Sequence, residues 1–423
     1  MKTITFFLGA GASAADGAPV MSRYLEEVER CFGNRDEWRE MEPVLMSCPC
    51  PVSSSSKYPA ISDFLTYLDE AIAEKSLVNG QDPERIRFLL LRLMFGRLTE
   101  QERPRPRFTW TKHTDVAPEP DLGSDREPMD ACQHSDNSRY NDYTCPDAAP
   151  PPSIDYVGSA QFTARPPVVS QPCSVDHLWS KELVELAPSQ LESAKTSANR
   201  RLAELAVDWG VKAVISTNYD LIFDQALEDL KVKFHYCVGY SEGCEAQHGI
   251  KFLKLHGSVN WLLCRGCAYV DVWRNSYPTQ TLWAEESISK PCRRCSGTRW
   301  TDMLVTPARR RSYEYLSLGL QPVWDETLAE LLKTDIIVFI GYSLPPEDRD
   351  ILDLLYKGVR KEAKVLVVDP SEDTVNRYRE TFGPLRVTPI PKSLSADLWD
   401  APEVRNTLEQ LGIGGGNGTS ALT

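Results

Sequence analysis

The sequence predicts an α/β fold: a doubly wound, Rossmann-like parallel sheet with a small zinc-ribbon module and a helical, partly irregular insertion. Short apolar runs alternate with amphipathic helical patterns, which is typical of a parallel sheet with helices on both faces. Glycine and polar motifs follow these runs directly, at the carboxyl ends where such sheets bind ligands. Two Cys-x-x-Cys pairs lie near each other in the chain, which indicates a metal module.

The predicted strands are short apolar runs bounded by turn residues. They cover residues 3–8, 213–216, 251–255, 336–340 and 365–368. The first predicted helix begins at Pro19, and its apolar residues Leu25, Val28 and Phe32 share one face. Three further helices are predicted over residues 63–75, 83–98 and 197–209. Strands that alternate with helices in this way favour a parallel sheet over an antiparallel one.

The predicted domain organisation is one core with two interruptions. The Rossmann-like core comprises residues 1–30, 205–258 and 304–412, the insertion residues 31–204, the zinc-binding module residues 259–303, and a flexible tail residues 413–423. Within the insertion, residues 101–173 are rich in Pro, Asp, Ser and Arg. Loops of such length are uncommon unless they have a function or are disordered. Because this segment separates two predicted site strands, we hypothesise that it covers the site until activation.

Charge and hydropathy exclude two classes of function. The 423 residues carry a formal net charge of −13, which argues against general nucleic-acid binding, because phosphate contacts need clustered Lys and Arg. A local basic patch is not excluded; the run Arg309-Arg310-Arg311 is interpreted as a solvated surface, with contact to an anionic ligand as the alternative. No stretch approaches the roughly 18 apolar residues of a membrane span.

The opening residues, MKTITFFLGAGASAADGAPVMS, fit either a secretory signal or a strand that runs into a glycine-rich turn. The cysteines favour the second interpretation. Two residues separate Cys264 from Cys267 and Cys292 from Cys295, which is the spacing of a structural tetrathiolate zinc site, with free or disulfide-paired cysteines as the alternative. Thiolates held reduced on zinc imply a cytoplasmic protein. The other eight cysteines are interpreted as structural or incidental.

A sharp motif follows each predicted strand, so these motifs should meet at one edge of the sheet. They are residues 9–13 (GAGAS), 216–220 (STNYD), 255–258 (LHGS), 341–345 (GYSLP) and 368–371 (VDPS). The first allows backbone N–H groups to approach a diphosphate, helped by a helix amino terminus, and Asp369 is well placed for a ribose hydroxyl. As alternatives, Asn218 could cap a helix that begins near Tyr219, and His256 could be a buried, satisfied histidine.

Taken in order, GAGAS…GAP, STNYD, LHG, two Cys-x-x-Cys pairs, GYSLP and VVDPS resemble the Sir2 (sirtuin) superfamily over residues 1–30 and 205–390. The resemblance implies that NAD is the substrate and that zinc is structural. It implies catalytic roles for Asn218 and for His256, the general base. It further implies zinc ligation by Cys264, Cys267, Cys292 and Cys295, and NAD contacts by Gly9, Ala10, Gly11, Ser13, Asp220, Gly341, Ser343 and Asp369.

Departures from the family pattern bear on the reaction. Protein deacylases of this superfamily read GIPDFR after the first loop, with a phenylalanine that shields the reactive ribose carbon, whereas residues 17–22 here read GAPVMS. Their V-x-F-G-E segment, which pairs with the acyl-lysine peptide, corresponds to LVTPAR at residues 304–309. Departure of nicotinamide leaves an oxocarbenium-like sugar. Without a shield or a peptide groove, water becomes the expected nucleophile. Histidine, whose unperturbed pKa is near 6.5, is suited to take a proton from it at neutral pH.

The sequence therefore predicts an NAD hydrolase (NAD glycohydrolase) that releases nicotinamide and ADP-ribose. It resembles the Sir2-like effectors of prokaryotic antiphage defence, which deplete NAD when infection is sensed. That resemblance implies a homo-oligomer and a separately encoded activating partner such as an ATPase. Two alternatives stay open at this point: an NAD-dependent deacylase or ADP-ribosyltransferase, and a non-catalytic sensor of NAD or ADP-ribose.

Overall fold

The computed structural model describes residues 2–18, 23–54, 56–100, 109–112, 179–182, 197–238, 249–273, 290–307 and 317–413. The chain divides into two compact units. One comprises Met1–Arg105 with Leu186–Thr423, and the other comprises Pro106–Glu185. In the smaller unit, β2 (Thr109–Lys112) pairs antiparallel with β3 (Trp179–Glu182). The following paragraphs concern the larger unit.

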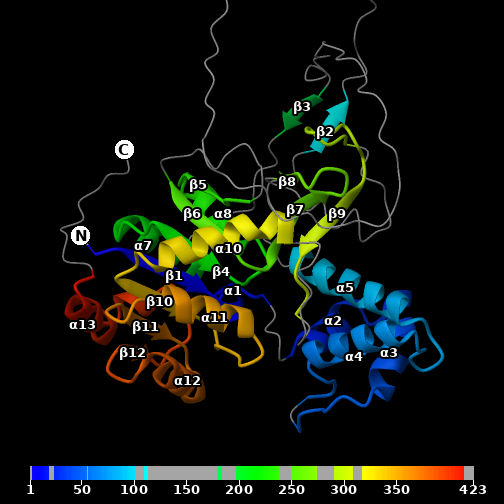
Figure 1. Ribbon diagram of the computed structural model, residues 1–423, viewed down its shortest axis with the longest axis horizontal. Helices are drawn as coiled ribbons and strands as arrows, with labels where there is room; N and C mark the ends of the chain where they lie inside the picture. Colours follow the sequence, from blue (N-terminus) through cyan, green and yellow to red (C-terminus); the bar gives the residue numbers. More distant parts are fainter. Residues whose placement is uncertain are drawn as a thin grey trace, which may run out of the picture. The chain divides into compact units, whose positions relative to one another are not determined.

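A seven-stranded sheet forms the centre of the larger unit (Figure 1). Its strands are β1 (Ile4–Leu8), β4 (Ala213–Ser216), β5 (Phe234–His235), β6 (Ile250–Lys254), β10 (Ile336–Ile340), β11 (Lys364–Val368) and β12 (Val387–Ile390). Their order is β12-β11-β10-β1-β4-β6-β5, and every neighbouring pair is parallel. The predicted Rossmann-like α/β class is confirmed.

The predicted strands agree closely with the observed ones. β4 and β10 have the predicted bounds, β1 and β11 differ by one residue at one end, and β6 is shifted by one residue at both ends. The two edge strands were not predicted. β5 has only two residues, and β12 contains Pro389, which a sequence pattern treats as a strand breaker although an edge strand tolerates it.

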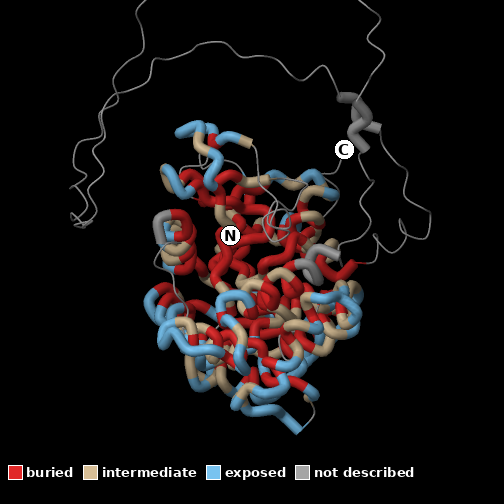
Figure 2. Tube along the Cα trace, turned by 90° about the vertical axis from the view of Figure 1, so that its right-hand side faces the viewer, coloured by how far each residue is buried: buried red, intermediate tan, exposed pale blue. Residues whose placement is uncertain are grey.

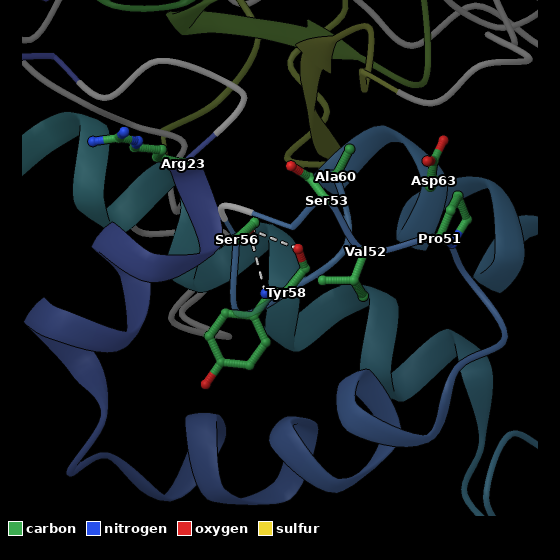
Figure 3. A pocket seen from close by; sticks show the side chains of 8 residues that line it. All are labelled: Arg23, Pro51, Val52, Ser53, Ser56, Tyr58, Ala60 and Asp63. Atoms are coloured by element: carbon green, nitrogen blue, oxygen red, sulfur yellow. Dashed lines mark hydrogen bonds between the residues drawn. The ribbon is translucent and has the colours of Figure 1, made fainter.

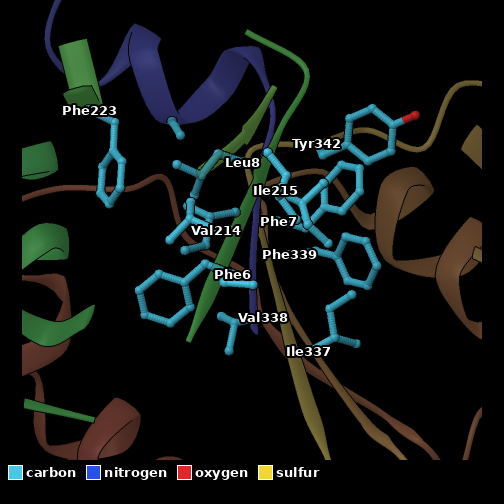
Figure 4. Packing of buried hydrophobic residues seen from close by; sticks show 14 of the residues in the cluster. Phe6, Phe7, Leu8, Val214, Ile215, Phe223, Ile337, Val338, Phe339 and Tyr342 are labelled. Carbon is cyan, nitrogen blue, oxygen red and sulfur yellow. The ribbon is translucent and has the colours of Figure 1, made fainter. Parts of the chain in front are cut away.

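Helices cover both faces of the sheet because successive strand residues point to opposite sides. Phe6 packs edge-on against Trp209, and Trp209 packs edge-on against Trp399. Phe7 points the other way, against Phe339 (Figure 4), and Phe339 packs on Tyr378. The helices around the sheet are α7 (Ala198–Asp208), α8 (Ile222–Asp229), α10 (Ser317–Leu331), α11 (Arg349–Gly358), α12 (Glu372–Phe382) and α13 (Pro402–Leu411), with the short η2 (Leu398–Asp400).

A second core lies in the helical part of the insertion, and Figure 2 shows how buried and exposed residues distribute along the chain. It is formed by α2 (Tyr24–Phe32), α3 (Asp36–Ser47), α4 (Ile61–Glu74) and α5 (Pro83–Glu100). Leu25, Val28 and Phe32 are buried in it, as predicted. α3 was not predicted, because it contains Pro43 and a proline inside a pattern normally argues against a helix.

A small antiparallel sheet carries the four paired cysteines. It consists of β7 (Gly257–Cys264), β8 (Val270–Val272) and β9 (Trp300–Leu304), in the order β8-β7-β9. β7 begins directly after His256, so one strand connects the predicted base to the first cysteine. Among the helices that the structure describes, none is both long and apolar enough to cross a membrane.

Candidate functional site

The ends of β1 and β10 form the centre of the candidate site. β1 lies between β10 and β4, and the chain leaves β1 and β10 in opposite directions along the sheet, which is the topology that binds ligands in Rossmann-like folds. The Gly9 N–H donates to the Ile340 carbonyl at 3.0 Å, and the Gly11 N–H donates to the Gly341 carbonyl at 2.9 Å. The predicted glycine motifs are therefore in direct contact.

Glycine is required here because the two backbones touch. A Cβ atom on Gly9 would lie 2.5 Å from the Gly341 oxygen, and one on Gly341 would lie 2.4 Å from the Ala12 nitrogen. Gly341 also has a φ of +62°, which side-chain-bearing residues rarely adopt. The following helix, α1 (Ala10–Ala14), is only five residues long. The N–H groups of Gly9 and Gly11 already have partners, so their observed contribution is close backbone packing.

Asn218 joins this centre from the end of β4. Its Nδ2 donates to the Gly9 carbonyl at 2.9 Å and to Ser13 Oγ at 2.8 Å. It does not cap the next helix, because the N-cap of α8 is Leu221, with no side-chain cap hydrogen bond. With both amide hydrogens engaged, Oδ1 is the atom that can accept a hydrogen bond from a ligand hydroxyl or from water.

His256 follows β6 and is 4% exposed. Its Nδ1 lies 3.2 Å from the Thr217 carbonyl oxygen. Since a carbonyl can only accept, Nδ1 carries the proton of this bond, and the basic lone pair of the neutral ring is at Nε2. The ring stacks on Tyr219 with centroids 6.0 Å apart. Gly257, the next residue, has a φ of +81°, and a Cβ there would lie 1.8 Å from the Met303 oxygen.

A buried charged network supports the loop that carries Asn218. Lys254 is fully buried, and its ammonium donates to the Asp220 carbonyl at 2.5 Å and lies 3.4 Å from Asp224 Oδ2. Tyr236 donates to the other oxygen of Asp224. Desolvation raises the pKa of the Asp220 carboxyl, while the charge of Lys254 and the hydrogen bond from Ser13 oppose that rise.

The last two predicted nucleotide contacts come from the β10 and β11 ends. Asp369 is buried, and its Oδ1 accepts from the Ser371 N–H at 2.9 Å, which holds the turn after β11. Ser343 is exposed, and its carbonyl accepts from Arg377 Nε at 2.9 Å. These residues thus border the same sheet edge from the β11 side.

Three residues of this region were missed by the sequence reasoning: Asp16, Lys254 and Tyr219. Asp16 lies just after α1 and caps α7, since its carboxylate accepts from Ser197 Oγ at 2.6 Å and from the N–H groups of Ala198 and Asn199 at 3.0 and 2.9 Å. Two signals could have found two of these residues. Asp16 is an acidic residue soon after the glycine turn, and Lys254 is a lysine inside a run that was interpreted as a buried strand.

The four paired cysteines come together as predicted. Their ligand atoms all lie within 4.8 Å of one another, with Sγ distances of 3.5 Å for Cys264–Cys295 and 3.6 Å for Cys267–Cys292. Sulfurs on a tetrahedral zinc ion with bonds of about 2.3 Å lie about 3.8 Å apart, so the set fits zinc. Without a metal ion, desolvation raises the pKa of Cys264 and Cys267. Although desolvation raises it too, backbone N–H groups of Cys295 and Arg294 lower the pKa of Cys292 to about 7. Zinc would favour the thiolate form of all four. The cysteine set is closed by four protein ligands and lies at the opposite end of β7 from His256, so zinc would be structural.

Replacing one of these cysteines should therefore unfold the module. For Cys292→Ser we expect loss of bound zinc and a decrease of several kcal/mol in the free energy of unfolding, because zinc binding supplies folding energy to such modules. Metal analysis and denaturant unfolding measure both effects. Cys31→Ser, which changes a half-buried cysteine outside the module, is the control. Full zinc content in the Cys292 variant would contradict the assignment.

A separate cavity of about 550 Å³ lies in the helical part of the insertion, and none of the predicted site residues lines it. One arginine, one aspartate and several hydroxyl groups contribute to its wall, and Ser56 and Tyr58 hydrogen-bond to each other there (Figure 3). The lining residues are Arg23, Pro51, Val52, Ser53, Ser56, Tyr58, Ala60 and Asp63.

Some of the sequence-based predictions lie outside the described residues. They are the replacement of the aromatic shield at residues 19–22, the arginine run at 309–311, the irregular segment 101–173 apart from β2, and the tail from residue 414.

Comparison with known proteins finds a family model that matches part of the chain. Residues 212–383 match the model of the SIR2-like domain, and no curated protein matches the sequence significantly. A structure from work on the mechanism and regulation of Sir2 enzymes is 19% identical, with a TM-score of 0.30, covering 53% of this chain and 76% of that one. A mutant Sir2 homologue in complex with 2'-O-acetyl ADP ribose is 12% identical, with a TM-score of 0.40, covering 98% and 95%. TM-scores of this size indicate neither an activity nor a substrate.

Proposed function

Because residues 212–383 match the SIR2-like domain, we propose that this chain is a member of the Sir2 superfamily and an NAD hydrolase, which cleaves the nicotinamide–ribose bond and releases ADP-ribose. Membership of the superfamily supports the coarser statement that the function depends on NAD. The finer statement, that water is the acceptor, rests on the segment that follows β9.

The main chain of Val305 is the observation that carries the proposal. Its N–H donates to the His256 carbonyl at 2.9 Å, and its carbonyl accepts from the Tyr219 hydroxyl at 2.5 Å. A peptide that binds by adding a strand needs free backbone donors and acceptors at the sheet edge. Both groups of Val305 already have partners inside the protein, so this residue cannot pair with a substrate peptide in that way.

The same segment also packs against the helices of the insertion. Leu304 is buried among residues of α2–α5, and Arg87 of α5 donates to Thr306 Oγ1 at 3.4 Å. This is the segment that corresponds to the peptide-pairing strand of the deacylases. Its use in internal packing supports a reaction that requires no peptide acceptor.

The proposed chemistry assigns one task to each polar group. Asn218 Oδ1 would orient a ribose hydroxyl or the attacking water, and Nε2 of His256 would take a proton from either. Asp220, Ser343 and Asp369 would contact the nucleotide around the β1/β10 centre. General-base assistance of this kind typically contributes about 100- to 10,000-fold to the rate.

The test is nicotinamide release from NAD, measured with and without an acylated lysine peptide. We expect release without peptide, and a decrease of about 100- to 10,000-fold in both Asn218→Ala and His256→Ala. Asn376→Ala, an exposed position on α12, and His235→Gln, a buried histidine on β5, are the matched controls and should retain turnover. Release only with peptide would instead support the deacylase alternative, and NAD binding without turnover under all conditions would support the sensor.

The biological setting is also part of the proposal. An enzyme that depletes NAD must be inactive until it is needed, which suggests control by assembly or by a partner. The role in antiphage defence, the homo-oligomer and the separately encoded activating partner stay predictions at the level of the family resemblance.

A further inference from the structure

The zinc-bearing tip carries a cluster of exposed arginines on an otherwise acidic chain. Residues 264–270 and 290–300 contain four arginines and one lysine but no Asp or Glu. Lys290 pairs with Asp271 at 2.6 Å, so the arginines supply the charge of the surface. All four are exposed: Arg265, Arg293, Arg294 and Arg299. We call this set the arginine tip.

The fold brings the arginines of the two Cys-x-x-Cys turns together. The Arg265 N–H donates to the Arg299 carbonyl at 2.8 Å. Arg293 and Arg294 lie in the second Cys-x-x-Cys turn, which the sulfur contacts Cys264–Cys295 and Cys267–Cys292 hold against the first turn. Zinc with four thiolates has a formal charge of −2, and the four guanidinium groups contribute +4, so these groups together carry +2. The carboxyl of Asp302 interacts with Arg265 as well. The whole chain, by contrast, has a formal charge of −13.

The surroundings of the arginines indicate the class of ligand. Protein partners are held mainly by aromatic and aliphatic anchors, yet within the described part of the zinc module no large hydrophobic residue is exposed. The tip instead offers guanidinium groups beside small residues such as Gly266, Ser296 and Thr298. Guanidinium groups bind phosphate oxygens in bidentate fashion, and such contacts do not require base recognition.

We propose that the arginine tip binds the phosphodiester backbone of nucleic acid, without sequence preference. This function is additional to the proposed NAD hydrolysis and does not depend on it, because the tip and His256 lie at opposite ends of β7. Non-specific binding of this kind has a Kd of about 10⁻⁴ to 10⁻⁶ M at physiological salt, and the net negative charge of the chain should keep the affinity at the weaker end.

The experiment is a salt titration of the full chain against a labelled duplex DNA of arbitrary sequence. If four phosphates are contacted, the slope of log K against log salt should be about −3.6, and about −1.8 in the double variant Arg265→Gln/Arg299→Gln. Arg379→Gln/Arg405→Gln removes the same charge from a half-buried position on α12 and an exposed position on α13. This control should keep the slope of the unmodified protein.

Three outcomes would overturn the proposal: no binding at low salt, a slope that the tip variant leaves unchanged, or equally tight binding to poly-glutamate. The last would identify the tip as a surface for acidic polypeptides. Zinc content and nicotinamide release should be unaltered in the tip variant, so a folding defect can be distinguished from loss of phosphate contacts. Since DNA binding is measured without NAD, its failure would leave the proposed hydrolase function untouched.

Discussion

Lys254→Met should lower the free energy of unfolding by about 3–5 kcal/mol, because removing one partner of a buried ion pair leaves the other charge uncompensated. Lys254 is completely buried, and Asp224, its partner, is 3% exposed. Denaturant unfolding followed by circular dichroism measures the difference. Lys251→Met, on the same strand, removes a partly exposed lysine that pairs with Glu326 and the buried Glu330. It should cost less, because Glu330 keeps its ion pair with Lys333 at 2.9 Å.

The dependence of this loss on pH distinguishes a charge effect from a packing effect. Burial raises the pKa of Asp220, and Lys254 opposes the rise. A carboxyl whose folded pKa is raised contributes stability at pH values below its unfolded pKa and loses it as the pH rises through the folded pKa. Without Lys254 the folded pKa rises further, so the deficit of the methionine variant should grow from acidic to neutral pH. A deficit that is the same at all pH values would mean that Lys254 acts through packing alone.

Gly341→Ala should both destabilise the fold and abolish nicotinamide release. A positive φ costs a non-glycine residue about 1–3 kcal/mol, and overpacking typically costs a further 1–3 kcal/mol. The added Cβ would lie 2.5 Å from the Gly11 carbon atoms, so the loops after β1 and β10 must separate. Thermal unfolding and NAD turnover report the two effects.

Gly383→Ala is the matched control for this variant. Gly383 also has a positive φ, +89°, but a Cβ there would meet no atom within 4 Å. It should therefore show the backbone cost alone and retain turnover. Equal losses in the two variants would mean that contact between the two glycine loops is unimportant for the site.

The strands of the sheet were predictable because each is a short apolar run followed directly by a polar motif. β4 and β10, for example, are buried at every position, which distinguishes them from the amphipathic helices around them. The same rule placed the glycine motifs and Asn218 at one sheet edge, where the structure brings them into contact. Parallel strands make this inference possible, since all their carboxyl ends lie on one side.

What the sequence could not indicate depends on contacts between distant residues. The capping of α7 by Asp16 spans more than 180 positions, and a local pattern contains no information about it. The sequence analysis assigned no role to Tyr219, which lies between Asn218 and Asp220. In the structure it stacks on His256, contacts Phe95 of α5 edge-on and holds the Val305 carbonyl. Its role arises from the packing of the helical insertion against the strand ends, which no periodicity predicts.

The strand order also has a consequence for biosynthesis. β1, made first, has no neighbour in the sheet until β4 is made more than 200 residues later, and its other neighbour begins at Ile336. Non-local pairing of this kind slows folding, because long loops must close before contacts form. The candidate site at the β1 and β10 ends thus cannot assemble on the ribosome until β10 has emerged. A nascent or truncated chain that ends before β10 would lack the candidate site, so the order of the strands itself delays any activity of that site until β10 has been made.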